Sequence, residues 1–197
     1  MKSKACYGFN EKFTKKDNYN MIYTETEVFD LILNCEHTPK VVLMCGLSGS
    51  GKTTFAKQLE CYGFHRLSVD EEIWNNYGQF GIDYAEEEYD KLSALAEKAL
   101  FIQFLELLKS KRNIVVDFSF WQKEKRNEFK RIVETNHGKW FLVYMNPPIS
   151  AIKNRLKIRN KTFEANAAFP ITDSILNKYI HGFQIPEQEN QLEIVSI

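Results

Sequence analysis

A short glycine-rich stretch has the residue types and the spacing of a phosphate-binding loop. Gly46-Leu47-Ser48-Gly49-Ser50-Gly51-Lys52-Thr53 matches G-x-x-x-x-G-K-[ST] at every fixed position. Glycines let successive backbone N–H groups curl around an anion, and the helix that follows directs its positive end toward the same point. Lys52 is spaced to reach the β- and γ-phosphates of a nucleotide, and the Thr53 hydroxyl to ligate Mg²⁺. The residues predicted to bind the nucleotide are Gly46, Ser48, Gly49, Ser50, Gly51, Lys52, Thr53 and Thr54.

Two aspartates follow short apolar segments and are the candidate acidic groups. Asp70 comes after Leu67-Ser68-Val69, where a carboxylate can accept a proton from an attacking hydroxyl or help to hold Mg²⁺. It would equally serve as the N-cap of the helix that follows. Asp117 ends an apolar run in a Walker-B-like arrangement, in which the carboxylate polarises a magnesium-bound water or positions the acceptor. A turn at the end of a strand is the alternative. Thr53 and Asp117 are the predicted magnesium ligands.

A run of five cations without an anion lies between Lys153 and Lys161. Within it, Arg155 and Arg159 are four residues apart and therefore share one face of a helix. Such a pair can close over a triphosphate and neutralise the charge that develops on the transferred group. A solvated basic face of a helix is the usual alternative. We predict that both arginines act with Lys52 and Asp70 in catalysis.

Alternating strands and helices must position these residues. Continuous apolar runs predict buried strands, and apolar residues at helical spacing predict the segments between them. The strands are expected at 41–45, 64–69, 113–117, 140–145 and 192–196, and the helices at 52–60, 85–110, 122–134, 149–158 and 174–181. This alternation predicts an α/β fold with a parallel sheet of about five strands and helices on both faces. Parallel sheets bind ligands beyond the carboxyl ends of their strands, which is where the candidate residues fall.

The chain is expected to form one domain with an additional N-terminal segment. Residues 1–39 are predicted to be an extension packed on the core, because a separate domain of that size could hardly bury a core. Thr24 and Glu27 have the spacing of a capping box, which predicts a short helix ending before Pro39. Residues 40–197 form the predicted nucleotide-binding domain, with a lid near 155–170.

Composition limits the partners. The 197 residues include 26 Lys and Arg and 26 Asp and Glu, so no net charge draws the chain to nucleic acid or to a membrane surface. No apolar run is long enough to span a bilayer, and the four cysteines show no metal-ligand spacing, so we expect a cytoplasmic protein with free thiols. Eight acids and no Lys or Arg lie between Asp70 and Asp90, which disfavours a nucleic-acid acceptor; one acidic solvent face of a helix is the alternative. Residues 109–131 hold eight cations against three acids, a weak indication of polyanion binding.

The order of these segments resembles that in the small bacterial P-loop kinases. These AAA-type ATP-binding proteins are grouped with zeta toxins, polynucleotide 5′-kinases and chloramphenicol phosphotransferase. The resemblance extends over residues 41–187 and rests on the glycine-rich loop, Ser68-Val69-Asp70-Glu71, Val115-Val116-Asp117-Phe118-Ser119-Phe120, Arg155-x-x-x-Arg159-Asn160 and Phe183-Gln184-Ile185-Pro186-Glu187. It implies a P-loop NTPase-type fold, ATP and Mg²⁺ as cofactors, Asp70 as the base, Asp117 as the group that orders Mg²⁺ or the acceptor, and Arg155 and Arg159 on the lid.

Three functions agree with this pattern. The first is an ATP-dependent phosphotransferase that moves the γ-phosphoryl group to a hydroxyl of a small, non-anionic acceptor. The second has a nucleic-acid 5′ end or a nucleotide sugar as acceptor, as in the toxins. Many such kinases have an Arg shortly after the base Asp to hold an acceptor phosphate, whereas Glu71-Glu72-Ile73-Trp74 stands here, which weakens the nucleic-acid alternative. The third is an ATP-binding switch or interaction module without transfer.

Overall fold

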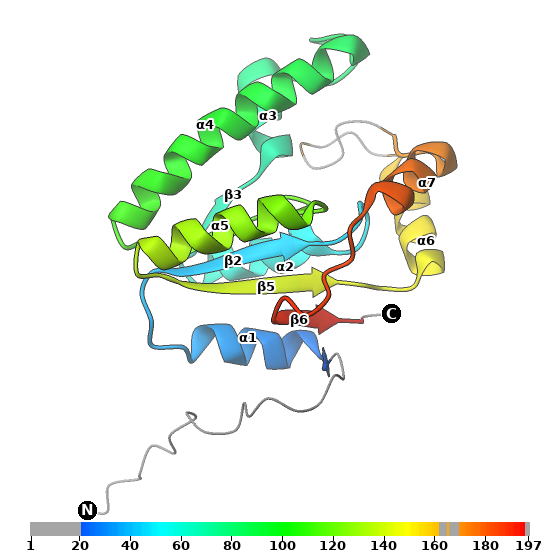
Figure 1. Ribbon diagram of the computed structural model, residues 1–197. Helices are drawn as coiled ribbons and strands as arrows, with labels where there is room; N and C mark the ends of the chain where they lie inside the picture. The colour runs from blue at the N-terminus through cyan, green and yellow to red at the C-terminus, as the bar shows by residue number, and fades with distance from the viewer. Residues whose placement is uncertain (1–20, 162–164, 166–169, 196–197) are drawn as a thin grey trace, which may run out of the picture.

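A parallel β-sheet with helices on both faces forms the centre of the computed structural model, which describes residues 21–161, 165 and 170–195 (Figure 1). Among these residues the sheet has six strands in the order β1-β6-β5-β2-β4-β3, and every neighbouring pair is parallel. The strands are β1 (Ile22–Tyr23), β2 (Lys40–Cys45), β3 (His65–Leu67), β4 (Ile114–Val116), β5 (Lys139–Met145) and β6 (Gln191–Ile194). The predicted α/β class and the five predicted strands are confirmed. The sequence pattern missed β1, because two largely exposed residues carry no periodicity.

The described residues form seven α-helices, and all but the one at 69–77, which begins where the strand predicted at 64–69 was to end, lie close to the predicted segments. They are α1 (Glu25–Leu33), α2 (Lys52–Cys61), α3 (Val69–Tyr77), α4 (Tyr89–Lys109), α5 (Lys123–Thr135), α6 (Ile149–Arg159) and α7 (Asp173–Gly182). The long helix begins at Tyr89 rather than at Ala85, because a 3₁₀ turn over Glu86–Glu88 precedes it. None of the helices among the described residues is long and apolar enough to cross a membrane.

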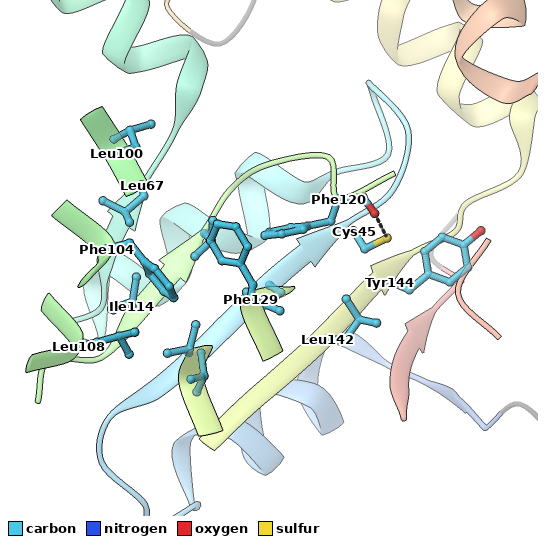
Figure 2. Close-up of a cluster of buried hydrophobic side chains, with 14 residues drawn as sticks. Cys45, Leu67, Leu100, Phe104, Leu108, Ile114, Phe120, Phe129, Leu142 and Tyr144 are labelled. Carbon is cyan, nitrogen blue, oxygen red and sulfur yellow. Dashed lines mark hydrogen bonds between the residues drawn. The ribbon is translucent and has the colours of Figure 1, made fainter. Parts of the chain in front are cut away.

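Successive side chains of β2 point to opposite faces of the sheet, and the core therefore has two layers. Val41, Leu43 and Cys45 face α4 and α5, where they meet apolar residues such as Phe104 and Phe129. Figure 2 shows this layer. Val42 and Met44 point to the opposite face, where α1 and α2 cover the sheet. A strand that is buried on both faces reads as a continuous apolar run, which explains why β2 is recognisable in the sequence.

Strand order brings three carboxyl ends together. β2 lies between β5 and β4, and β3 pairs with the far side of β4. The register sets Leu43 of β2 opposite Val116 of β4, and Val116 opposite Leu67 of β3. The chain therefore leaves β2, β3 and β4 at one edge of the sheet, and the residues that follow these strands become neighbours.

The described part of the N-terminal segment joins the same sheet and core. The Thr24 hydroxyl accepts the Glu27 N–H at 3.2 Å, and the Glu27 carboxylate accepts the Thr24 N–H at 2.7 Å, so the predicted capping box is present. Val28 and Ile32 of α1 are fully buried, and β1 pairs with β6. Residues 1–20 of the predicted extension, and 162–164 and 166–169 of the predicted lid, lie outside the described residues.

Candidate active site

The glycine-rich loop, residues 46–51, connects β2 to α2, and its backbone has the conformations that glycine allows. Gly46 has a φ of 144°, and a Cβ on it would lie 2.6 Å from the Met145 carbonyl oxygen. Gly49 has a φ of 80°, and a Cβ there would lie 3.0 Å from the Leu156 side chain. Other residues would strain the backbone or displace α6 and β5 at these positions. The loop is therefore specified by its glycines and by the elements that pack against it.

Polar groups of this loop fit a phosphate. The Ser50 hydroxyl is fully buried and has no hydrogen-bond partner within the described part of the chain. Lys52 begins α2, and its ammonium donates to the Leu47 carbonyl at 2.9 Å, so it lies over the loop. Burial lowers the pKa of Lys52, and the nearby carboxylates of Asp117 and Asp70 offset part of that effect. An anion in the loop would receive backbone N–H groups, the helix N-terminus and a half-buried cation together.

Asp70 lies in the first turn of α3, immediately after β3. Ser68 is the N-cap, and its hydroxyl accepts the Glu71 N–H, so the N-cap alternative for Asp70 is wrong and its carboxylate has no capping bond to make. Tyr89 of α4 donates its hydroxyl to Asp70 Oδ1 at 3.3 Å. Burial raises the pKa of Asp70 and the Asp117 carboxylate raises it further, whereas Arg159, the Tyr89 hydrogen bond and Lys52 act in the opposite direction. A raised pKa suits a carboxylate that accepts a proton.

Asp117 follows β4 and forms a buried ion pair that the sequence pattern did not indicate. Arg66 of β3 donates through Nε at 3.0 Å and Nη2 at 2.9 Å to Asp117 Oδ2, and both side chains are almost fully buried. The Arg66 guanidinium also contacts Glu71 of α3 at 2.7 Å. Arg66 thus joins the end of β4 to the start of α3, and it fixes Asp117 relative to Asp70.

The donor set agrees with a magnesium ion bound together with a nucleotide. The Thr53 hydroxyl follows Lys52 on α2, and Asp117 supplies a carboxylate whose two oxygens can accept more bonds than Arg66 donates. Within residues 21–161, 165 and 170–195, no three His, Cys, Asp or Glu side chains form a group that could hold a metal. Mg²⁺ characteristically takes one or two protein ligands plus substrate phosphates, so the residues present fit that ion.

The two arginines of α6 diverge, although they share one helix. Arg155 donates through Nη1 to the Ser50 carbonyl at 3.1 Å and so lies against the phosphate loop. Arg159, one turn further, lies near Asp70, Tyr89 and Tyr179 of α7; burial lowers the pKa of its guanidinium, and those groups counteract the change. The structure therefore places Arg155 with the predicted nucleotide-binding residues and Arg159 with the predicted base.

Sequence reasoning missed three residues near the predicted base: Arg66, Tyr89 and Tyr179. They come from β3, α4 and α7, and no spacing connects them to Asp70. Arg66 gave one weak signal, a charged residue inside a short apolar segment that leads to Asp70. The two tyrosines gave none, because tyrosine at a helical position is ordinarily a packing residue.

Comparisons with known proteins agree with this fold. The model of a protein family described as an AAA domain matches residues 41–186. No curated protein sequence matches the chain. A Chloroflexus aurantiacus structure, provisionally named a kinase, has a TM-score of 0.60 at 15% identity, covering 83% of this chain and 86% of that one.

Two further solved structures have the same fold. Chaetomium thermophilum Kti12, in complex with ADP-AlF3, has a TM-score of 0.58 at 16% identity, covering 79% and 88% of the two chains. A gluconokinase from Sinorhizobium meliloti has a TM-score of 0.54 at 18% identity, covering 82% and 86%. At these identities the likeness establishes the P-loop kinase-like fold, and the family match establishes membership. The chain belongs to the AAA domain family of P-loop proteins.

Proposed function

We propose that this protein transfers the γ-phosphoryl group of ATP to a hydroxyl of a small, non-anionic acceptor. The observation that carries the proposal is the convergence of Lys52 and Asp70, which are close enough for each charge to affect the pKa of the other. A phosphate-binding lysine and a half-buried carboxylate with a raised pKa are the two groups that transfer to a hydroxyl requires.

Each residue then has a separate task. The backbone of residues 46–51 and Lys52 bind the β- and γ-phosphates, and Arg155 holds the loop through the Ser50 carbonyl. Asp70 accepts the acceptor's proton, and the Tyr89 hydroxyl orients its carboxylate. Arg159 neutralises charge on the transferred group. Thr53 and Asp117 hold Mg²⁺, which when bound neutralises the phosphate oxygens. Positioning and charge neutralisation account for catalysis of this kind.

The surroundings of Asp70 favour an acceptor without negative charge. The Phe80 ring packs edge-to-face on Tyr84 and Tyr89 at 5.9 and 6.1 Å between ring centroids, which gives this side aromatic surface and phenol hydroxyls. No Lys or Arg occurs between Asp70 and Asp90. An anionic acceptor would meet acidic side chains there, so a neutral or cationic molecule with hydroxyl groups fits better.

An alternative acceptor is a nucleic-acid 5′ end. A chain of a Pnkp1/Rnl/Hen1 RNA repair complex has a TM-score of 0.53 at 20% identity, covering 78% of this chain and 50% of that one. Such an acceptor predicts binding that weakens steeply with salt, because contacts to phosphates release counterions. A flat salt response would exclude it in favour of the small acceptor.

Mass spectrometry of reactions supplied with ATP and Mg²⁺ tests the proposal. A library of hydroxylated metabolites and antibiotics is screened for one compound that gains a single phosphoryl group. Lys52→Ala must abolish that product while the protein stays folded. Lys57→Ala is the matched control, because Lys57 lies on the same helix, is exposed and, among the described residues, forms a single weak ion pair, with Glu71 at 3.8 Å. Full turnover in Lys52→Ala would defeat the mechanism. If Asp70→Asn retains ATP binding and every measurable activity, an ATP-binding switch or interaction module without transfer replaces the proposed phosphotransferase.

A further inference from the structure

The largest fully buried side chain in the described structure is a charged one, Arg126 of α5. Its Nε and Nη2 donate to the two carboxylate oxygens of Glu189 at 2.9 and 2.6 Å. Its Nη1 donates at 2.9 Å to two backbone carbonyls, those of Phe120 and Gln184. A buried guanidinium is costly unless its donors are satisfied, and these four bonds use four of its five N–H groups. Arg126 therefore holds three parts of the chain together: α5, the segment after α7, and the loop between β4 and α5.

That loop contains a backbone conformation that needs support. Phe120 has a φ of 41°, in the left-handed region that side chains other than glycine adopt at a cost. Its carbonyl accepts from Arg126 and also from the Cys45 thiol at 3.4 Å, as Figure 2 shows for the Cys45 bond. Its ring packs on Phe118 and Phe129 at 5.8 and 5.0 Å between centroids. Packing and hydrogen bonds together hold Phe120 in this conformation.

The same loop holds the first residue of the phosphate loop. The Ser119 carbonyl, one residue before Phe120, accepts the Gly46 N–H at 3.2 Å. Cys45, whose thiol donates to Phe120, is the residue directly before Gly46. Two consecutive residues at the end of β2 are thus bonded to two consecutive carbonyls of the loop that Arg126 anchors.

We propose that Arg126 is a positioning residue for the nucleotide site: by fixing Phe120 and Ser119 it sets the backbone at Cys45 and Gly46, where the phosphate loop begins. Arg126 forms no hydrogen bond to a predicted site residue. It acts through the loop that it anchors at Phe120, whose carbonyl and that of Ser119 accept from Cys45 and Gly46. The proposal rests on the proposed nucleotide site, and it adds a residue that neither the sequence pattern nor the site geometry had assigned to that site.

Lys130 provides a matched comparison on the same helix. It is also nearly buried, and it donates to the Glu189 carboxylate at 3.0 Å and to the Glu189 carbonyl at 3.2 Å. Within the described part of the chain the Lys130 side chain donates hydrogen bonds to Glu189 alone, whereas Arg126 also reaches Phe120. If Arg126, Lys130 and Glu189 only stabilise the fold, loss of either cation should have the same effect on hydrogen exchange at residues 45–46. A positioning role predicts a difference at residues 45–46.

The experiment compares Arg126→Met with Lys130→Met in two readouts. Amide hydrogen exchange is followed in nucleotide-free protein for a peptide that covers residues 43–48. Calorimetry then measures the affinity for a non-hydrolysable ATP analogue with Mg²⁺. In Arg126→Met we expect exchange at Gly46 to accelerate about tenfold beyond the change in global stability, and the affinity to fall about tenfold. In Lys130→Met both values should stay within about twofold of wild type after the same correction.

Arg126→Lys keeps the experiment decisive if Arg126→Met does not fold. A lysine retains the charge opposite Glu189 but not the fork that reaches Glu189 and Phe120 together, so it should show the same acceleration at Gly46. If exchange at Gly46 is as fast in Lys130→Met as in the variants of Arg126, the positioning role is overturned. The exchange readout needs no nucleotide or acceptor, so its failure is distinguishable from the absence of a phosphorylated product, which would overturn the proposed function alone.

Discussion

The proposed phosphate side of the site and its proposed acceptor side are built in different ways. The phosphate side, residues 46–53, is one continuous segment between β2 and α2, and much of its chemistry is backbone chemistry. The acceptor side is assembled from Asp70 of α3, Tyr89 of α4 and Arg159 of α6, which are far apart in the sequence. A local motif therefore carries the nucleotide site, whereas the acceptor site exists only after the fold has formed.

Burial acts on the two sides with opposite consequences. It lowers the pKa of Lys52 and raises the pKa of Asp70, since in each case it disfavours the charged form. A partly desolvated cation interacts more strongly with a phosphate, and a carboxylate with a raised pKa is a better proton acceptor. The same cause thus suits one residue to binding and the other to proton transfer.

The largest expected effect comes from the start of the phosphate loop. A Cβ in Gly46→Ala would lie 2.6 Å from the Met145 carbonyl at a φ of 144°, so the backbone must move and several N–H donors move with it. We expect nucleotide affinity and turnover to fall together, turnover by about 10³-fold, because one misplaced donor alone costs 10²–10³. Calorimetry and initial rates measure both quantities.

Gly63→Ala is the control for backbone strain. Gly63 lies just beyond α2 with a φ of 83°, and a Cβ there would meet nothing within 4 Å. This variant should lower stability by about 1 kcal/mol and leave nucleotide affinity unchanged. Equal loss of affinity in the two variants would mean that strain, rather than the position of the loop, explains the result.

Asp70→Asn separates the two sides. Nucleotide affinity should remain, while turnover falls about 10²-fold because the proton acceptor is lost. The melting temperature at neutral pH should rise, because the native state no longer has to bury a carboxylate whose pKa it raises. Glu72→Gln removes the same charge two residues further along α3, where the backbone carbonyl accepts the Asn76 side-chain N–H, and it should change neither quantity. Loss of nucleotide affinity in Asp70→Asn would contradict the division into two sides.

The phosphate side could be predicted from the sequence, for a physical reason. Gly46 and Gly49 adopt backbone conformations that other residues avoid, so their identity reports the shape of the loop. The central strand β2 is equally visible, because burial on both faces requires apolar residues at every position. Both features are properties of single short segments, and no distant contact is needed to recognise them.

Features that depend on distant contacts could not be predicted. Arg66 pairs with Asp117, which lies 51 residues away, and Tyr89 bonds to Asp70 across two helices. The β1 strand exists because β6, near the other end of the chain, supplies its partner. The N-cap alternative for Asp70 was wrong because Ser68 and Asp70 are both good N-caps, and only the backbone conformation at Ser68 decides between them.

Tyr89→Phe is expected to have a smaller effect than Asp70→Asn. The lost hydrogen bond acts to lower the pKa of Asp70, so its removal raises that pKa further. The acid limb of the rate profile should move to higher pH, and turnover near pH 6 should fall by less than about tenfold. Tyr77→Phe, at the exposed end of α3, is the control and should leave the profile unchanged. An unshifted acid limb in Tyr89→Phe would remove Tyr89 from the acceptor side.

The smallest expected effect concerns stability: removing the charge of Asp70 and removing the charge of Glu189 should change the melting temperature in opposite directions. Burial raises the pKa of Asp70, so its ionised form costs stability above that pKa, and the cost disappears as the pH falls below the ordinary Asp value. Burial alone would also raise the pKa of Glu189, but hydrogen bonds from Arg126 and Lys130 outweigh it and hold that pKa below its ordinary value. Glu189 therefore contributes stability above the ordinary Glu pKa, and loses it as the pH falls through its native value. Thermal melts from pH 7 to pH 3 should show Asp70→Asn above wild type and Glu189→Gln below it, with both differences shrinking toward acid. Differences of the same sign at pH 7 would show that the acceptor carboxylate is held by its partners, as Glu189 is, and not disfavoured by burial.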